Sequence, residues 1–327
     1  MKGPRTFIVS VLTLFALLLG GEPFAIGSAQ VTDLPTIRVT GPPNDGLTPI
    51  YYGIRSGLFQ KAGLNVELTP ANSGVVAAAA VIGGSADVAY INMLSLSQSH
   101  LRGVPLEIVA AGSLYLSNKP NAGMAVLKDS PIRTAKDLDG KTLASGSVKD
   151  LNAAGMLAWI DQNGGDSHTV KVIELPTSAA MLAALEERRI DAAAVIEPGL
   201  AQMLKAGDTR VLAHHYDALA KRFEQTAFVS MPAFVDSNRA LMQRFAAALR
   251  QSVIYVNAHP AQTVDILSSY TGATPEEVAQ SVRIITAETV DVRDLQPLID
   301  VAAKYGLIDH SFPASELISP TALKSGR

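Results

Sequence analysis

The fold is decided by two stretches of the chain, residues 78–92 (AAAVIGGSADVAYIN) and residues 182–196 (LAALEERRIDAAAVI). Both stretches contain the end of a helical segment, a short turn, an aspartate (Asp87 or Asp191) and an apolar run of small residues. A short apolar run bounded by a turn is typical of a buried parallel strand. Two explanations of the similarity stay open, which are convergence on a common helix-to-strand turn and an internal duplication.

The alternation of apolar runs and helical segments extends outward in both directions and predicts an α/β fold with parallel strands. Thr48 and Pro49 are expected to start one helix, and Ser147 is expected to cap another. Beyond residue 231 the chain is expected to be mostly helical. We expect strands at 37–39, 65–68, 87–91, 107–111, 123–127, 141–144, 170–175, 192–196, 210–213 and 227–231, and late helices at 237–258, 261–270, 275–285 and 294–305.

The N-terminus has the features of an export signal. Lys2 and Arg5 precede an uncharged apolar run at 7–19, and small residues follow at 27–29. The run is shorter than the ~20 residues that a membrane-spanning helix needs. We therefore expect residues 1–29 to be a signal peptide that is cut before Gln30, with a short N-terminal anchor helix as the alternative. The mature protein is then expected in a bacterial periplasm.

Composition excludes several classes of protein. The chain has no cysteine, so neither a disulfide nor a lipid-modified cysteine is expected, and an exported chain of this length must depend on an ordinary core in two lobes. Its 27 basic and 30 acidic residues form no basic block, which argues against a nucleic-acid partner.

Sequence signatures of catalysis are few. Residues 83–87 (GGSAD) fail the nucleophile-elbow pattern at the last position, and neither a phosphate-binding loop nor a His-Glu-x-x-His motif occurs. His214 and His215 are adjacent, so on a strand they would point to opposite faces and could not easily share a metal. We expect no catalytic residue, no metal and no cofactor.

Polar residues at the ends of expected strands are the candidates for ligand binding. Open α/β sheets bind ligands at the carboxyl ends of their strands, and the free N–H groups at a helix start can hold an anion. Ordinary N-capping is the alternative for each single loop. Glu197 follows the strand at 192–196, and its carboxylate either recognises an amine or hydroxyl group of the ligand or is a solvated loop acid. The candidate residues are Asn44, Asp45, Ser73, Gly74, Asn92, Ser113, Ser147 and Glu197.

Five stretches carry a resemblance to a known family: 37–39 (IRV), 57–68 (GLFQKAGLNVEL), 84–89 (GSADVA), 136–141 (KDLDGK) and 196–198 (IEP). Over residues 36–232 the chain resembles the nitrate/sulfonate/taurine-binding family of ABC transporter substrate-binding proteins, which is related to thiamine-pyrimidine-binding proteins. The resemblance implies a type II periplasmic-binding-protein fold, with two α/β lobes joined by two crossing strands and a ligand cleft between them. Lobe I is expected at 30–125 and 228–327, and lobe II at 126–227.

The resemblance also implies a function. The chain is expected to capture a small polar or anionic ligand, such as a sulfonate, nitrate or taurine, by lobe closure, and to deliver it as a monomer to an ABC permease and ATPase. A sensory module that feeds a membrane receptor, or a binder of pyrimidine precursors, is the alternative. An enzyme is not expected, because the pyrimidine-forming synthase of this fold depends on cysteines.

Family members often carry a Tyr-Gln pair after the first strand, where this chain has 41–44 (GPPN), and many carry Trp-Asp-Pro where it has 196–198 (IEP). The ligand pocket is therefore expected to differ in shape from that of typical family members.

Overall fold

A computed structural model describes residues 34–320 and 322. The expected signal peptide at 1–29 lies outside the described residues. From Leu34 onward the described chain belongs to one compact unit. Within it, no helix combines the length and the apolar character needed to cross a bilayer.

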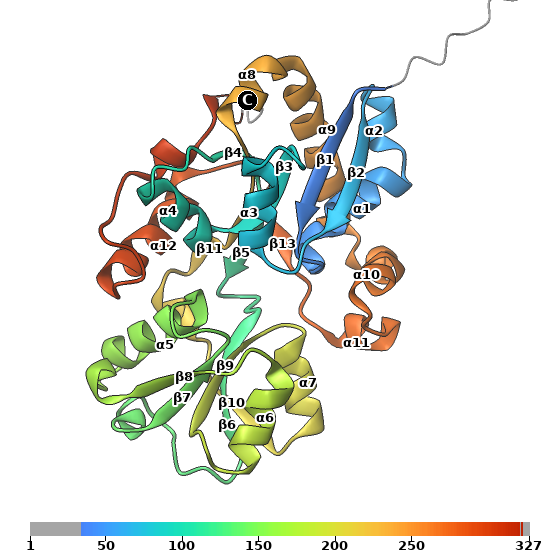
Figure 1. Cartoon of the computed structure of the whole chain (residues 1–327). Coiled ribbons are helices and arrows are strands. Elements are labelled where there is room, and N and C mark those ends of the chain that lie inside the picture. Colours follow the sequence, from blue (N-terminus) through green and yellow to red (C-terminus); the bar gives the residue numbers. More distant parts are fainter. Residues whose placement is uncertain (1–33, 321, 323–327) are drawn as a thin grey trace, which may run out of the picture. The chain divides into compact units, whose positions relative to one another are not determined.

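The strands form two five-stranded sheets and one three-stranded sheet (Figure 1). The first sheet has the order β2-β1-β3-β12-β4, the second β10-β6-β9-β7-β8 and the third β11-β5-β13. The strands are β1 (Thr36–Gly41), β2 (Asn65–Pro70), β3 (Val88–Asn92), β4 (Glu107–Ala111), β5 (Ser113–Leu116), β6 (Ala122–Leu127), β7 (Thr142–Ser145), β8 (Lys171–Glu174), β9 (Ala192–Ile196), β10 (Thr209–Ala213), β11 (Arg222–Glu224), β12 (Thr226–Ser230) and β13 (Ile285–Thr286).

Helices connect and cover these strands. They are α1 (Thr48–Arg55), α2 (Leu58–Lys61), α3 (Gly74–Ile82), α4 (Met93–Leu101), α5 (Leu151–Gln162), α6 (Ser178–Glu186), α7 (Gly199–Ala206), α8 (Pro232–Ser237), α9 (Arg239–Ala258), α10 (Val264–Thr271), α11 (Pro275–Gln280) and α12 (Val292–Lys304). Short 3-10 helices are η1 (Asp45–Leu47), η2 (Lys136–Leu138), η3 (Ser167–Thr169), η4 (His215–Ala218), η5 (Pro260–Thr263) and η6 (Ala314–Leu317).

The expected α/β class is confirmed. β1 pairs in parallel with β2 and β3, and β7 pairs in parallel with β8 and β9. β12 and β6 run antiparallel to their neighbours, and each is the first strand that the chain forms after moving from one large sheet to the other. The chain enters the second sheet at Ala122 and returns to the first at Thr226.

The two stretches with similar sequence occupy equivalent places. The carboxylate of Asp87 accepts a hydrogen bond from the backbone N–H of Arg38 in β1 at 2.8 Å, and that of Asp191 accepts one from Thr142 in β7 at 2.9 Å. In both cases the partners are 49 positions apart. Each aspartate therefore ties the start of the third strand of a β-α-β-α-β unit to its first strand.

The equivalence extends to helix caps and turns at a constant offset of 104 positions. Ser73 and Thr177 cap α3 and α6 through the backbone N–H three residues on. Gly84 and Arg188 both have a positive φ, 74° and 54°, and Arg188 is the one non-glycine residue with such a φ in the described chain. Agreement in spacing, caps and turn conformation favours internal duplication over convergence on a single turn.

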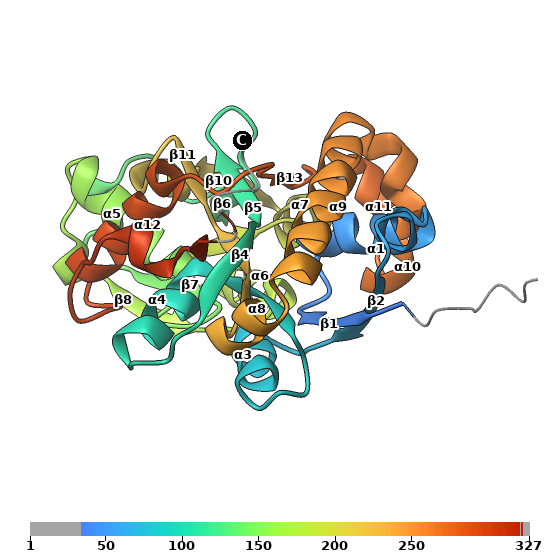
Figure 2. The same ribbon diagram turned by 90° about the horizontal axis from the view of Figure 1, so that it is seen from above.

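Each large sheet is covered on both faces. On the first sheet, α1, α2 and α9 pack against one face, where Phe59 and Phe245 stack with ring centroids 5.7 Å apart. α3, α4 and α12 pack against the other face. On the second sheet, Met124 and Val126 of β6 face α5, whereas Ala125 faces α6 and α7. Figure 2 shows α9, α10 and α11 grouped beside α1, and α12 beside α4 and α5.

Several expected boundaries were wrong. Thr48 does not cap α1, since its hydroxyl bonds to Asp45 and Tyr270, and Ser147 does not cap α5, because Asp150 accepts from Ala153 N–H instead. The expected helix at 275–285 ends at Gln280, and the one expected at 237–258 begins at Arg239 after the separate helix α8. Strands β5, β11 and β13 and helices α2 and α7 were not predicted.

Candidate functional site

A cavity of about 480 Å³ lies in the described chain beside a groove of about 450 Å³ that shares Pro198, Gln202 and Glu277 with it, and the size of the cavity is typical of a small-molecule site. Both large sheets and both segments that link them contribute to its lining. The lining residues are Pro43, Asn44, Asp45, Tyr90, Ser113, Asn121, Ile196, Glu197, Pro198, Gln202, Gln225, Thr226, Leu267, Thr271, Gly272, Ala273, Glu277, Val278, Ser281, Val282 and Ile284.

Three hydroxyl groups form one wall of the cavity. The Tyr90 hydroxyl lies 3.1 Å from the Ser113 hydroxyl, which lies 2.6 Å from that of Thr226. Burial raises the pKa of Tyr90 to about 12, so the phenol stays protonated and can donate. Tyr90 reaches this place because the backbone of Gly46 passes beside its ring, where a Cβ would lie 1.7 Å from the hydroxyl oxygen.

Two amide side chains join the segments that link the large sheets. Asn121 precedes β6 and Gln225 precedes β12, and each donates to the other's carbonyl oxygen, at 3.4 and 3.0 Å. The backbone around them is also tied, because Gln225 N–H donates to the Ser113 carbonyl and Glu197 N–H to the Asn121 carbonyl. Both segments that link the two large sheets therefore line the cavity.

Glu197 enters the cavity directly after β9. The Glu197–Pro198 peptide bond is cis, and one carboxylate oxygen accepts a hydrogen bond from the Ala201 N–H at 3.0 Å. This is the one hydrogen bond of the Glu197 side chain within the described residues. Burial raises the pKa of Glu197, and the bond from Ala201 opposes that rise. The carboxylate thus occupies the N-terminus of α7 and keeps acceptor capacity for a ligand.

Asp45 is fully engaged within the protein. Its two oxygens accept from Nε and Nη2 of Arg283, both at 2.8 Å, from the Ile284 N–H at 2.8 Å and from the Thr48 hydroxyl at 2.8 Å. The Arg283 and Asp45 side chains are each 13% exposed. Asp45 therefore fixes the position of the segment before β13 and has no acceptor site left for a ligand.

The remaining wall comes from the C-terminal part of the chain and is largely apolar. It is lined by Leu267 of α10, Val278 of α11 and the residues Ser281, Val282 and Ile284 that follow α11. Thr274 and Glu277 form a capping box at the start of α11, and these hydrogen bonds lower the pKa of Glu277. Glu277 therefore adds a negative charge at the cavity edge.

Half of the residues predicted from sequence lie together. Asn44, Asp45, Ser113 and Glu197 line the cavity. The other four do not: Ser73 caps α3 beside Gly74, Asn92 caps α4 through the Ser95 N–H, and Ser147 donates its N–H to Asp150. The side-chain oxygens of Ser73 and Asn92 accept hydrogen bonds from N–H groups of their own helices, as the N-capping alternative expects. Sequence reasoning missed Tyr90, Asn121, Gln225 and Thr226.

The adjacent histidines have separate environments. His215 is completely buried, its Nε2 lies 3.2 Å from the Asn152 side-chain oxygen, and burial lowers its pKa to about 3. His214 bonds to the Ala122 carbonyl through Nδ1 at 2.9 Å. Within residues 34–320 and 322, no group of three or more metal-ligating side chains is placed to hold a metal ion.

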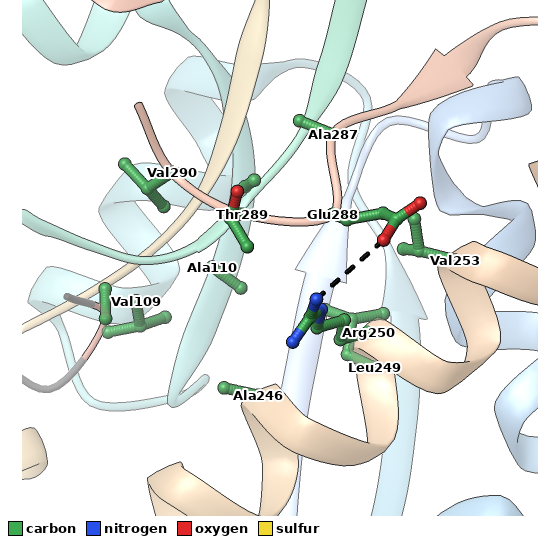
Figure 3. A pocket seen from close by; sticks show the side chains of 12 residues that line it. Val109, Ala110, Ala246, Leu249, Arg250, Val253, Ala287, Glu288, Thr289 and Val290 are labelled. Atoms are coloured by element: carbon green, nitrogen blue, oxygen red, sulfur yellow. Dashed lines mark ion pairs between the residues drawn. The ribbon is translucent and has the colours of Figure 1, made fainter. Parts of the chain in front are cut away.

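A second cavity lies between α9, β4 and the segment after β13 (Figure 3). Arg250 and Glu288 face each other across it at 3.9 Å, and the Arg250 Nε has no hydrogen-bond partner within the described chain. The cavity has a volume of about 20 Å³, enough for a single water molecule. Its size excludes it as a ligand site.

Solved structures share the fold. The periplasmic aliphatic sulphonate binding protein SsuA from Escherichia coli aligns with a TM-score of 0.74 and 18% identity over 87% of this chain and 92% of that one. The alkanesulfonate-binding protein SsuA from Xanthomonas axonopodis, bound to MOPS, aligns with a TM-score of 0.68 and 16% identity over 87% and 98%. DszB in complex with biphenyl-2-sulfinic acid aligns with a TM-score of 0.68 and 15% identity over 89% and 99%. The expected periplasmic-binding-protein fold is confirmed.

Sequence comparison gives the family. A Brucella abortus (strain 2308) protein, which carries only the general name of a binding protein, is 24% identical over 261 residues, 76% of this chain and 77% of that one. The sequence model of the family described as NMT1/THI5 like matches residues 44–263, which is well over half of the chain and includes 11 of the 21 residues that line the large cavity. The chain therefore belongs to the NMT1/THI5-like family.

Proposed function

We propose that this chain is the periplasmic solute-binding component of an ABC importer, which captures a small polar or anionic molecule between its two lobes. The observation that carries the proposal is the 480 Å³ cavity, whose lining comes from both large sheets and from both linking segments. A ligand held by all of these elements stabilises the closed arrangement selectively, and closure is the established motion of periplasmic binding proteins.

Location and partners follow from the same proposal. The sulphonate-binding relative is described as periplasmic, and the expected signal peptide at 1–29 agrees with export. The partners would be a small-molecule ligand and the permease and ATPase of the importer. The proposed lobes are residues 30–125 with 228–327, and residues 126–227.

We propose capture without turnover. The hydroxyl and amide groups of the cavity bond to one another, and the carboxylate of Glu197 caps a helix, so none of them is arranged as a nucleophile with an adjacent base. The DszB match shows that this fold also accommodates a sulfinic acid complex. Chemical change of a bound molecule during incubation with purified protein would contradict the proposal.

The test is ligand capture with closure. The purified protein is incubated with a metabolite extract, washed, and measured for its melting temperature and its radius of gyration by X-ray scattering. We expect one retained molecule to raise the melting temperature by mass action and to reduce the radius of gyration. No retained molecule, or retention without compaction, would contradict capture by closure.

Transport is distinguished from the sensory alternative in the native host. Deletion of the gene is expected to abolish uptake of the retained molecule when it is supplied at low concentration. Normal uptake together with loss of the transcriptional response to that molecule would favour the sensory module.

A further inference from the structure

The cavity has an unusual charge for a site in a protein that resembles anion-binding proteins. Within the described chain, none of its lining residues is a lysine, arginine or histidine. Three are acidic, Asp45 from the loop after β1, Glu197 from the end of β9 and Glu277 from α11. Asp45 is paired with Arg283, and Lys205 offsets the charge of Glu277, so Glu197 is the acid of this lining without a cation partner in the described chain. An anion placed beside Glu197 would meet repulsion in a partly enclosed space where charges are weakly screened.

The nearest cations are already used or lie outside. Arg283 gives its Nε and Nη2 to Asp45, its Nη2 also to the Thr263 hydroxyl and its Nη1 to the Pro260 carbonyl, and it does not line the cavity. Lys149 is exposed in the loop after β7 and does not line the cavity. Lys205 lines a neighbouring groove together with Glu277, whose charge it offsets.

The helix terminus that could bind an anion is also occupied. α7 begins at Gly199 beside the cavity, and its Ala201 N–H donates to the Glu197 carboxylate at 3.0 Å. A negative ligand group at this position would have to displace an internal carboxylate of the same charge. The positive end of α7 therefore stabilises Glu197 and is not available to a ligand anion.

The groups that remain suit a hydrogen-bond donor on an apolar body. Glu197 keeps acceptor capacity, and it lines the cavity together with Asn121 and Gln225. The side-chain oxygens of Asn121 and Gln225 each accept one bond from the other amide, which leaves each oxygen a second lone pair. Leu267, Val278, Val282 and Ile284 give an apolar wall of the same cavity. A ligand with N–H groups at one end and an apolar part at the other would match both sides.

We propose that the cavity selects an uncharged or cationic molecule that bears an amine, amidine or amide group on an apolar body, with Glu197 as its acceptor, and that it discriminates against sulfonates, sulfates and carboxylates. The inference rests on the proposed capture function and changes its ligand class from a small polar or anionic molecule to an uncharged or cationic one. Glu197 is then the specificity-determining residue of the site.

The test compares the charge of what the protein retains. Wild type, Glu197→Gln, Glu197→Lys and Glu174→Gln are each incubated with the same metabolite extract, washed and unfolded, and the released molecules are identified by mass spectrometry in both polarities. Gln at 197 keeps an oxygen acceptor for the Ala201 N–H and removes only the charge. Glu174 is exposed on β8 and serves as the matched control.

We expect wild type and Glu174→Gln to retain the same nitrogen-bearing neutral or cationic molecule. Glu197→Gln is expected to bind that molecule at least tenfold more weakly by calorimetry, since the bond to a charged acceptor becomes a bond to a neutral one. Glu197→Lys is expected to lose it altogether.

Retention of a sulfonate, sulfate or carboxylate by wild type would overturn this inference and leave the capture function standing. Unchanged affinity in Glu197→Gln would remove Glu197 as the acceptor and overturn it as well. Retention of no molecule by any of the four proteins would contradict the capture function itself, and with it the inference.

Discussion

Glu224 of β11 gives the sharpest test of the energetics, because it is a completely buried acid in a segment that links the lobes. Its Oε1 accepts from the Gly112 N–H at 2.6 Å, and its Oε2 has no hydrogen-bond partner among the described residues. Burial raises the pKa of this carboxyl from 4.5 to about 8. Near neutral pH the folded protein therefore keeps a proton that the unfolded chain releases.

The sign of the effect follows from this difference. As pH rises from 4.5 toward 8, the unfolded state loses the Glu224 proton and the folded state holds it, so the free energy of unfolding falls. One pKa unit corresponds to about 1.4 kcal/mol, so the loss between about pH 5 and about pH 7.5 is roughly 3 kcal/mol. Above pH 8 both states are ionised and the contribution becomes constant.

Glu224→Gln removes the ionisable group and keeps an oxygen that can accept from Gly112. The free energy of unfolding by urea, measured for both proteins at about pH 5 and about pH 7.5, is expected to show the wild type losing roughly 3 kcal/mol more than the variant. Glu67→Gln, at an exposed position on β2, is the control and is expected to follow the wild type. Parallel pH dependences of wild type and Glu224→Gln would refute the reasoning.

Three further changes are expected to alter the urea midpoint in known directions. Arg188→Gly relieves a left-handed backbone conformation and should raise the free energy of unfolding by up to about 1 kcal/mol. A loss of stability would contradict the left-handed turn that Arg188 shares with Gly84. Gly46→Ala places a Cβ 1.7 Å from the Tyr90 hydroxyl oxygen and should cost about 1–3 kcal/mol, so an unchanged midpoint would show that the loop moves freely. Asp45→Asn removes the negative charge that pairs with the mostly buried Arg283 and should lower the free energy of unfolding by about 3 kcal/mol. An unchanged urea midpoint would contradict this expectation.

The parts of the fold that could be predicted are those with strong local patterns. The strands β3 and β9 are short apolar runs after a turn, and their aspartates mark the same turn in both units. β5 and β11 escaped prediction because each is three or four residues long and is stabilised by pairing between segments distant in sequence. No local period indicates such strands.

The site was harder to predict than the fold, for a reason visible at Ser147 and Asp150. Both residue types cap helices, and in residues 145–150 (SGSVKD) the sequence does not say which one does. Asp150 prevails because its carboxylate accepts from the Ser145 hydroxyl, the Ser147 N–H and the Ala153 N–H at once. Such hydrogen-bond networks decide which polar groups are satisfied within the protein. Only the remaining polar groups can bind a ligand.

The two units of similar structure contribute differently to one cavity. Residues 104 positions apart share a backbone role, so the first residue after β3 is Met93 and the first after β9 is Glu197. In the first unit Asn92 caps α4 and the helix begins at once, whereas in the second Glu197 and Pro198 intervene before α7. The later start of α7 allows the carboxylate of Glu197 to accept from this helix while it lines the cavity. The ligand preference proposed above thus depends on a local departure from an otherwise repeated frame, and substitutions at residues 196–198 should change the ligand without changing the fold.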